Sequence, residues 1–119
     1  IGKLSAYCGA VSAAAGAVSG IAWLDGESEE IIKKTIINTI CTVGGMVCDG
    51  AKPSCASKVA AALGTAILSL EMAKRGSAFS VGEGLVMDTA ENTIKSIGRM
   101  ASQGMENTDN IILQIMLGN

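Results

Sequence analysis

Residues 4–24 read LSAYCGAVSAAAGAVSGIAWL, and this stretch decides the fold class. It is apolar or small throughout, and its alanines offset the helix-weakening effect of its glycines. Such a run forms either a membrane-spanning helix with small-residue packing faces or a buried central helix that its neighbours approach closely. We favour burial, because the run is poor in the Leu, Ile and Phe residues that drive membrane insertion and contains serines and a cysteine.

Composition extends this prediction to the whole chain of 119 residues. Hydrophobic residues make up 49% and aromatic residues only 3%, so the core must consist of Ala, Val, Ile, Leu and Met. Such a core suits closely packed helices better than a β-sandwich. We therefore expect an all-α bundle of about five helices, in one domain over residues 1–119, around a buried Ala/Gly-rich helix at residues 4–23. Because the chain starts with Ile1, we expect it to be a fragment of a longer protein.

Capping signals divide the rest of the chain into helices. Ser28 is a suitable N-cap for the second helix, and Gly76 a suitable C-cap for the third. Asp88 and Glu91 resemble a capping box, and residues 77–87 between them and Gly76 read as a loop. The helices after the first are expected over residues 28–43, 54–75, 89–102 and 108–117.

Charge and residue types exclude several functions. The net charge is −2, and there is no dense basic run, which argues against nucleic-acid binding. The absence of histidine excludes a Ser-His-Asp site, a Cys-His site and a zinc site with imidazole ligands. No secretory signal is visible, so we expect a cytoplasmic protein without a membrane association.

The four cysteines do not all lie in the same kind of sequence. Cys41 continues the apolar face of the second helix, which favours a structural role. Cys48 and Cys55 flank a turn at residues 49–53 that contains Asp-Gly, Lys and Pro, an environment that presents thiolates. A disulfide and simple burial remain alternatives, although the lack of a secretory signal argues against a disulfide.

The cysteine spacing favours a further hypothesis. Cys48 and Cys55 form a C-x6-C pair with Cys8 far upstream, unlike the paired CxxC of structural zinc or the CxxCxxC run of ferredoxins. Three thiolates from separate elements would suit an iron–sulfur cluster with one iron left open. An open iron can act as a Lewis acid on a substrate.

Four segments resemble a known family: GKLSAYCGAVSAAAGA, NTICTVGGMVCDGAKPSCASKVA, VGEGLVMDTAENTIKSIGRM and GMENTDNIILQIM. They are similar to the C-terminal helical domain of L-cysteine desulfidases and, more distantly, to the α-chain of iron–sulfur L-serine dehydratase. The resemblance covers nearly the whole chain in one order. Its most specific part is CDGAKPSC together with the upstream YCGA.

This resemblance implies an oxygen-sensitive [4Fe–4S] cluster held by Cys8, Cys48 and Cys55, with Cys41 outside the ligand set. The family reaction is α,β-elimination without pyridoxal phosphate. L-cysteine gives pyruvate, ammonia and sulfide, and L-serine gives pyruvate and ammonia. Family members also carry an N-terminal region that helps to form the active site. We therefore expect a cluster-bearing lyase domain of amino-acid catabolism that is inactive alone, with its catalytic base unidentified.

Several expectations stay open at this level. Lys52 is either a charge partner for the thiolates or the substrate carboxylate, or a solvated loop lysine, and Asp49 is expected to shape the turn. L-serine dehydratase activity, a metal-free interaction module and a membrane helix bundle remain alternatives to the desulfidase. The expected partners are a small L-amino acid and the N-terminal region of the same protein. The oligomeric state is open, with a homodimer as one expectation.

The ligand hypothesis makes a geometric demand. Cys8 is separated by about forty residues from Cys48, so chance proximity of the two is improbable. If all three cysteines bind one cluster, their sulfurs must come within roughly 6–7 Å of one another. Cys8 must then face the loop that carries Cys48 and Cys55.

Overall fold

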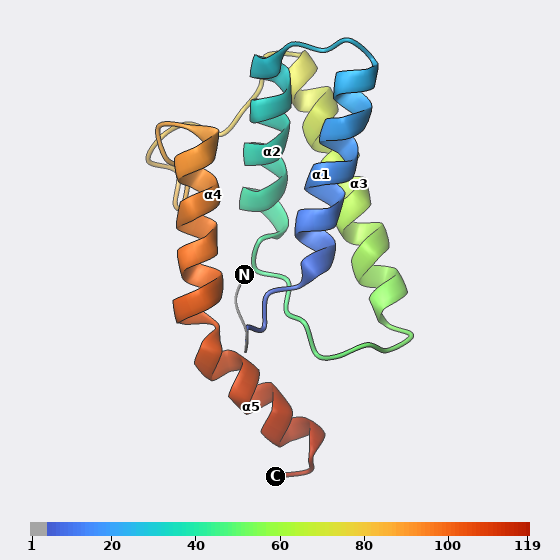
Figure 1. Cartoon of the computed structure of the whole chain (residues 1–119), viewed down its shortest axis with the longest axis vertical. Helices are drawn as coiled ribbons and strands as arrows, with labels where there is room; N and C mark the ends of the chain where they lie inside the picture. Colours follow the sequence, from blue (N-terminus) through green and yellow to red (C-terminus); the bar gives the residue numbers. More distant parts are fainter. Residues whose placement is uncertain (1–4) are drawn as a thin grey trace.

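The computed structural model describes residues 5–119, and helices dominate them (Figure 1). In these residues the only extended pairing is an isolated antiparallel bridge between Tyr7 and Val47. The all-α prediction is therefore confirmed. The helices, in chain order, are α1 (Gly9–Leu24), α2 (Glu29–Val43), α3 (Cys55–Lys74), α4 (Ala90–Arg99), the π-helix η1 (Met100–Gly104) and α5 (Glu106–Met116).

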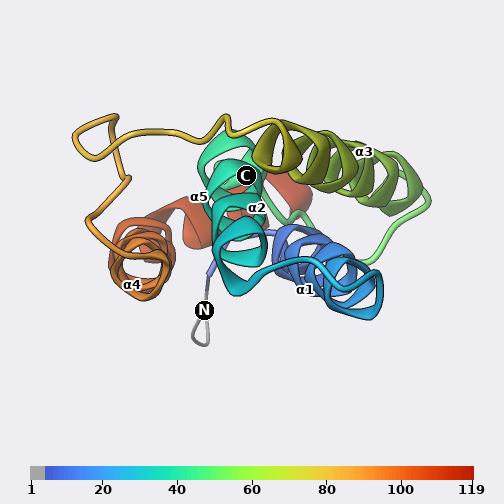
Figure 2. The ribbon, with the colours of Figure 1, turned by 90° about the horizontal axis from the view of Figure 1, so that it is seen from above.

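Helix α2 occupies the middle of the bundle. It packs against α1, α3 and α4, whereas α5 extends away from them beyond η1 (Figures 1 and 2). Helix α1 does not hold the central position expected for it, because it is buried on one face only. Trp23 and Leu24 at its end are 71% and 77% exposed. The small residues of α1 thus allow α2 and α3 to pack closely against one face of α1, while its other face stays exposed.

Two apolar clusters form the core. The first joins the start of α1 to α2, α4 and η1, and the second joins α1 to α3. Ala62 and Ala66 of α3 are fully buried in the second cluster, where their small side chains let α1 and α3 approach closely. The first cluster contains Tyr7, Val11, Ala15, Ile40, Ile97 and Ala101, and the second contains Ala14, Val18, Ala22, Ala62, Ala66 and Leu70.

Some predicted helix ends are confirmed by the structure. The Ser28 hydroxyl accepts a hydrogen bond from the Ile31 amide at 3.3 Å, as an N-cap does. Helix α3 ends at Lys74, and Gly76 follows with φ +79°, the left-handed conformation of a helix C-terminus. Local signals thus determine these two ends.

Other predicted ends are wrong. Helix α1 begins at Gly9, because residues 6–8 pair with residues 46–48 instead of continuing the helix; residue 4, the expected start, lies outside the described residues. The N-cap of α4 is Thr89, whose hydroxyl accepts from the Asn92 amide at 3.0 Å. Asp88 instead accepts from the Asn92 side chain, so the expected capping box does not form.

The end of the chain also differs from the expectation. Helix α4 stops at Arg99, and the chain continues as a π-helical turn over η1. The Ser5 hydroxyl donates to the Ala101 carbonyl at 2.8 Å, and such a contact from outside a helix favours a local change in its hydrogen-bond pattern. Helix α5 then begins at Glu106, before the predicted start at residue 108, and its N-cap Met105 makes no side-chain capping bond.

A buried asparagine joins α2 to the end of α3. Asn38 is fully buried, and its amide group donates to the Ser77 carbonyl at 3.1 Å and to the Ser69 carbonyl at 3.5 Å. Its side-chain oxygen accepts from the Phe79 amide at 3.1 Å. This one side chain therefore satisfies three backbone groups on two other segments, which a buried polar group requires.

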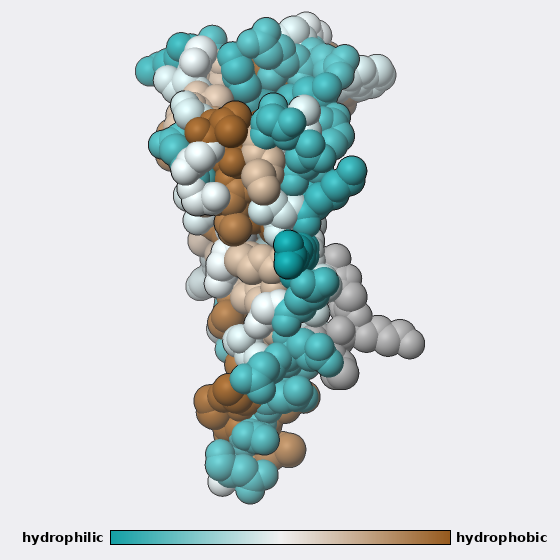
Figure 3. Space-filling model, turned by 90° about the vertical axis from the view of Figure 1, so that its left-hand side faces the viewer, coloured by the Kyte–Doolittle hydropathy of each residue, from teal (hydrophilic) through white to brown (hydrophobic). Residues whose placement is uncertain are grey.

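The surface is mixed in character. Viewed from the side of α4, apolar side chains gather in a vertical band in the upper half and again near the lower end (Figure 3). Helix α3 is long and apolar enough to cross a membrane by length and composition alone. A single helix of this kind is weak support for a membrane location, because core helices of soluble proteins pass the same test.

Candidate metal centre

The backbone pairs the segment that carries Cys8 with the segment that carries Cys48, with Tyr7 opposite Val47 in an antiparallel bridge. The Cys8 amide donates to the Met46 carbonyl at 3.0 Å, and the Cys48 amide donates to the Ala6 carbonyl at 2.6 Å. These two bonds join the segment before α1 to the segment after α2. Two cysteines about forty residues apart are thereby fixed on adjacent strands of backbone.

Cys55 approaches the same region from the start of α3. Its thiol donates to the Gly50 carbonyl at 3.4 Å, across the loop that follows Cys48. Gly50 has φ +94°, a conformation that favours glycine. The end of α5 also reaches this loop, since a Cβ added to Gly50 would lie 3.5 Å from the Met116 methyl group. The loop is thus folded back between its two cysteines.

The three predicted ligands supply thiols, the donor type that iron–sulfur clusters use. All four cysteines are free; Cys8 is 7% exposed, and Cys48 and Cys55 are partly exposed. Within residues 5–119, no three Cys, Asp or Glu side chains lie close enough together to bind one metal ion. A cluster makes a different demand, because each thiolate binds its own iron and the sulfurs stand farther apart. Soft thiolates are also the ligands that iron–sulfur clusters use.

A lysine that the sequence analysis did not single out lies in this region. Lys58 is 20% exposed, and its ammonium group donates to the Asp49 carboxylate at 2.6 Å and to the Val47 carbonyl at 2.8 Å. The pKa of Lys58 is raised, first by the hydrogen bond to Asp49 and further by negative charge on Cys8 and Cys55. Its ammonium group therefore lies near two of the three predicted ligands.

The two predicted neighbours of the ligands occupy different environments. The carboxyl pKa of Asp49 is lowered, mainly by the hydrogen bond from Lys58, and Lys52 adds a smaller effect. Lys52 itself is exposed. The spacing could have identified Lys58, because it follows Cys55 by three residues and so lies on the same helix face.

Cys41 lies elsewhere, against the first apolar cluster. Burial raises the pKa of its thiol. Burial also raises the pKa of the nearby Tyr7 hydroxyl, with smaller contributions from negative charge on Cys41 and Cys8. This packing agrees with a structural role for Cys41.

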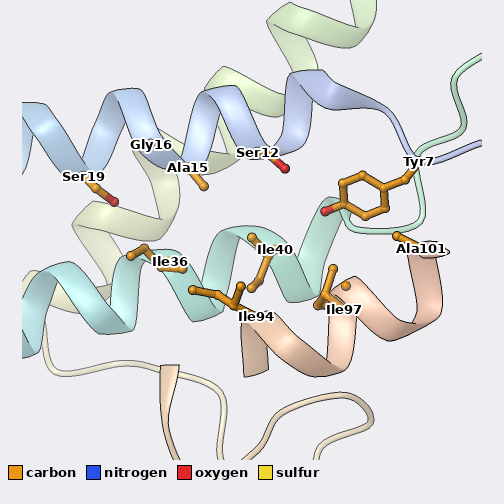
Figure 4. A pocket seen from close by; sticks show the side chains of 11 residues that line it. Tyr7, Ser12, Ala15, Gly16, Ser19, Ile36, Ile40, Ile94, Ile97 and Ala101 are labelled. Carbon is orange, nitrogen blue, oxygen red and sulfur yellow. The ribbon is translucent and has the colours of Figure 1, made fainter. Parts of the chain in front are cut away.

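A cavity of about 300 Å³ opens between α1, α2 and α4, close to the start of α1 (Figure 4). Four isoleucines line it from α2 and α4: Ile36, Ile40, Ile94 and Ile97. Its polar groups are the hydroxyls of Tyr7, Ser12 and Ser19. The Ser19 oxygen is buried and has no hydrogen-bond partner among residues 5–119. The cavity lining contains no charged side chain, so it does not suit a zwitterionic amino acid.

Comparison with known proteins gives a family. The family model for the serine dehydratase alpha chain matches residues 1–114. A UPF0597 protein of Lachnoclostridium phytofermentans is 53% identical over 98% of this chain, and one of Treponema denticola is 51% identical over 98%. The chain spans only 28% and 27% of these relatives' lengths. No solved structure matches the chain. From the match over nearly its whole length, we conclude that the chain belongs to the serine dehydratase alpha chain family.

Proposed function

We propose that this chain is the cluster-bearing domain of an iron–sulfur amino-acid lyase, with Cys8, Cys48 and Cys55 as the cluster ligands. The main support is the pair of backbone hydrogen bonds that joins the Cys8 segment to the Cys48 segment. Membership of the serine dehydratase alpha chain family is consistent with it. When bound, a [4Fe–4S] cluster with three protein ligands supplies a Lewis-acidic iron that makes the β-substituent of a substrate a better leaving group.

The residues of this chain hold and shape the site. The backbone pairing at residues 6–8 and 46–48 holds the segments of two of the proposed ligands together, and the third lies in the first turn of α3. The ammonium group of Lys58 supplies positive charge beside Cys8 and Cys55. Cys8 is almost fully buried, so it is shielded from water.

The proposed reaction is α,β-elimination. The substrate loses its α-proton and its β-substituent, which leaves as hydrogen sulfide from L-cysteine or as water from L-serine. The resulting 2-aminoacrylate tautomerises and takes up water to give pyruvate and ammonia. The base that removes the α-proton is not assigned to this chain, and we propose that another region of the full-length protein supplies it.

Two substrates are candidates for this reaction. The segments around CDGAKPSC favour L-cysteine through their resemblance to the desulfidases. The family match favours L-serine, because its description names a serine dehydratase. A cytoplasmic enzyme without pyridoxal phosphate is proposed in both cases.

The test is anaerobic reconstitution of the full-length protein with iron and sulfide, followed by assays of pyruvate and sulfide with L-cysteine, L-serine and other L-amino acids. We expect pyruvate from one of the two candidates, with sulfide released in equal amount if the substrate is L-cysteine. Serine-dependent pyruvate without cysteine-dependent sulfide would assign a dehydratase instead. Failure to take up iron would contradict the proposal and favour a metal-free interaction module.

A further inference from the structure

Lys58 joins the Cys48 segment to the helix that carries Cys55. Its ammonium group bonds the carbonyl of Val47 and the carboxylate of Asp49, the two residues on either side of Cys48. Cys55 and Lys58 lie three residues apart in α3 and share one helix face. One side chain therefore spans from the first turn of α3 to both flanks of a predicted ligand.

We propose that Lys58 is a positioning residue, which clamps the Cys48 segment to the start of α3 and sets the separation of Cys48 and Cys55. This inference rests on the proposed function in one respect, the identity of the two cysteines as cluster ligands. The clamp itself is a property of the protein without a cluster. Its contacts are with residues adjacent to Cys48, so Lys58 need not touch the cluster to act.

The backbone near Cys55 cannot perform this task. The amides of residues 55–58 bond the carbonyls of residues 52–54, at 2.9, 3.1, 3.1 and 3.4 Å. These amides are engaged in the turn that starts α3, and none of these bonds reaches the Cys48 segment. Beside the bond from the Cys55 thiol to the Gly50 carbonyl, the Lys58 side chain thus links α3 to both flanks of Cys48, nine residues from Asp49 and eleven from Val47.

A second acceptor distinguishes this contact from an ordinary surface ion pair. Exposed pairs contribute little, since water screens them and both side chains lose freedom. Lys58 is only 20% exposed and bonds a backbone carbonyl in addition to the carboxylate. The clamp therefore holds both flanks of Cys48 through one side chain of α3.

The variant that tests the clamp is Lys58→Met in the full-length protein, which keeps the apolar stem and removes the ammonium group. Lys74→Met is the matched control, because Lys74 lies on the same helix and pairs with Glu27 and Glu71 far from the cysteines. Lys58→Arg is the conservative variant that retains the charge. Three quantities are measured: amide hydrogen exchange over residues 46–50 without cluster, the half-life of cluster absorbance in anaerobic chelator, and the urea midpoint of unfolding.

We expect Lys58→Met to speed exchange at the Cys48 amide and to shorten the half-life of the cluster, each by at least about tenfold, because the charged hydrogen bonds to Val47 and Asp49 are both lost. The urea midpoint should change little, and Lys58→Arg should recover most of the lost half-life. Equal behaviour of Lys58→Met and Lys74→Met in exchange and half-life would overturn the inference. So would a fall in urea midpoint that accounts for the whole loss of cluster.

A second variant and a measurement on the protein without cluster complete the test. Asp49→Asn removes the charged partner and leaves the bond to Val47, so it should change exchange and half-life in the same direction by a smaller factor. If Lys58→Met does not fold, the test relies on Asp49→Asn. Unchanged hydrogen exchange and an unchanged cluster half-life in Asp49→Asn would then contradict the clamp. If the unmodified protein binds no cluster, the proposed function fails, whereas hydrogen exchange at residues 46–50 still tests the clamp.

Discussion

The contact around Asn38 and the loop around Cys48 both join distant parts of the chain, but they differ in what holds them. Asn38 is fully buried, satisfies three backbone groups and sits on the helix that packs against α1, α3 and α4. The Cys48 segment depends on two backbone bonds to the segment before α1, on the Lys58 side chain, and on a partly exposed loop.

This difference indicates that the fold and the site are separable. Substitutions around Asn38 or between α1 and α3 should lower the free energy of unfolding of the whole domain. Substitutions in the loop of residues 48–55 should change the thiol geometry and leave most of the helical packing intact. A site held by few contacts can also adjust when a cofactor binds, since metal binding is commonly coupled to local folding.

The largest effect on the fold should come from Asn38→Ala. Its removal leaves the Phe79 amide and the Ser77 carbonyl without their buried partner, so we expect a loss of about 3 kcal/mol in the free energy of unfolding. Urea denaturation measures it. Asn107→Ala, at an exposed position on α5, is the control and should change the free energy by less than about 0.5 kcal/mol. A loss below about 1 kcal/mol in Asn38→Ala would contradict the claim that the Asn38 contacts stabilise the fold.

A substitution between α1 and α3 should have the next largest effect. Ala62 is fully buried where the two helices meet, so Ala62→Leu should overpack the second apolar cluster and cost about 2 kcal/mol. The adjacent Ala61 is exposed, and Ala61→Leu should be close to neutral. Thermal unfolding of the pair measures the difference. Equal midpoints for the two variants would contradict the close packing of α1 on α3.

Gly50→Ala tests whether the conformation of the loop between Cys48 and Cys55 controls cluster uptake. At φ +94° a side chain is strained by about 1 kcal/mol, and the new Cβ meets Met116. We expect a small loss of stability together with a large loss of cluster uptake. Gly64→Ala is the control of opposite sign: this helical glycine has no atom within 4 Å of an added Cβ, so alanine should stabilise the protein by about 0.5–1 kcal/mol. Unchanged iron content in Gly50→Ala would show that the loop conformation does not control the site.

The smallest effect on the site should come from Cys41→Ala. Cys41 packs on the first apolar cluster, so we expect full cluster absorbance and a stability loss of about 1 kcal/mol or less. Because burial raises the pKa of this thiol, its alkylation by iodoacetamide in the unmodified protein should require a higher pH than that of an ordinary cysteine. Loss of cluster absorbance equal to that in Cys48→Ala would reverse the assignment of Cys41.

The sequence predicted those features that depend on local signals. The cap at Ser28 and the end of α3 before Gly76 follow from residue type and position, and the structure has both. The start of α1 could not be found in this way. Residues 5–8 continue the apolar run, and their departure from the helix comes from pairing with residues 46–48, which no local pattern shows.

The same reasoning applies to the site. Cys48 and Cys55 attract notice through the turn between them, and Cys8 through the family resemblance. Lys52 lies inside the loop between the two cysteines, whereas Lys58 lies beyond it and is indicated only by its helical spacing from Cys55. The π-helical η1 accepts a hydrogen bond at Ala101 from Ser5, ninety-six residues away, and local propensity does not predict a contact of this kind.

The central claim is that Cys8 joins Cys48 and Cys55 in holding one cluster. Its most direct test is iron content and the electron paramagnetic resonance of the reduced cluster after anaerobic reconstitution of the full-length protein, compared with Cys8→Ser. We expect about four irons per chain in the unmodified protein. Cys8→Ser should lose most of the iron and the cluster signal, with the helical circular dichroism retained. A Cys8→Ser variant that keeps the iron content and spectrum of the unmodified protein would show that Cys8 is not a ligand.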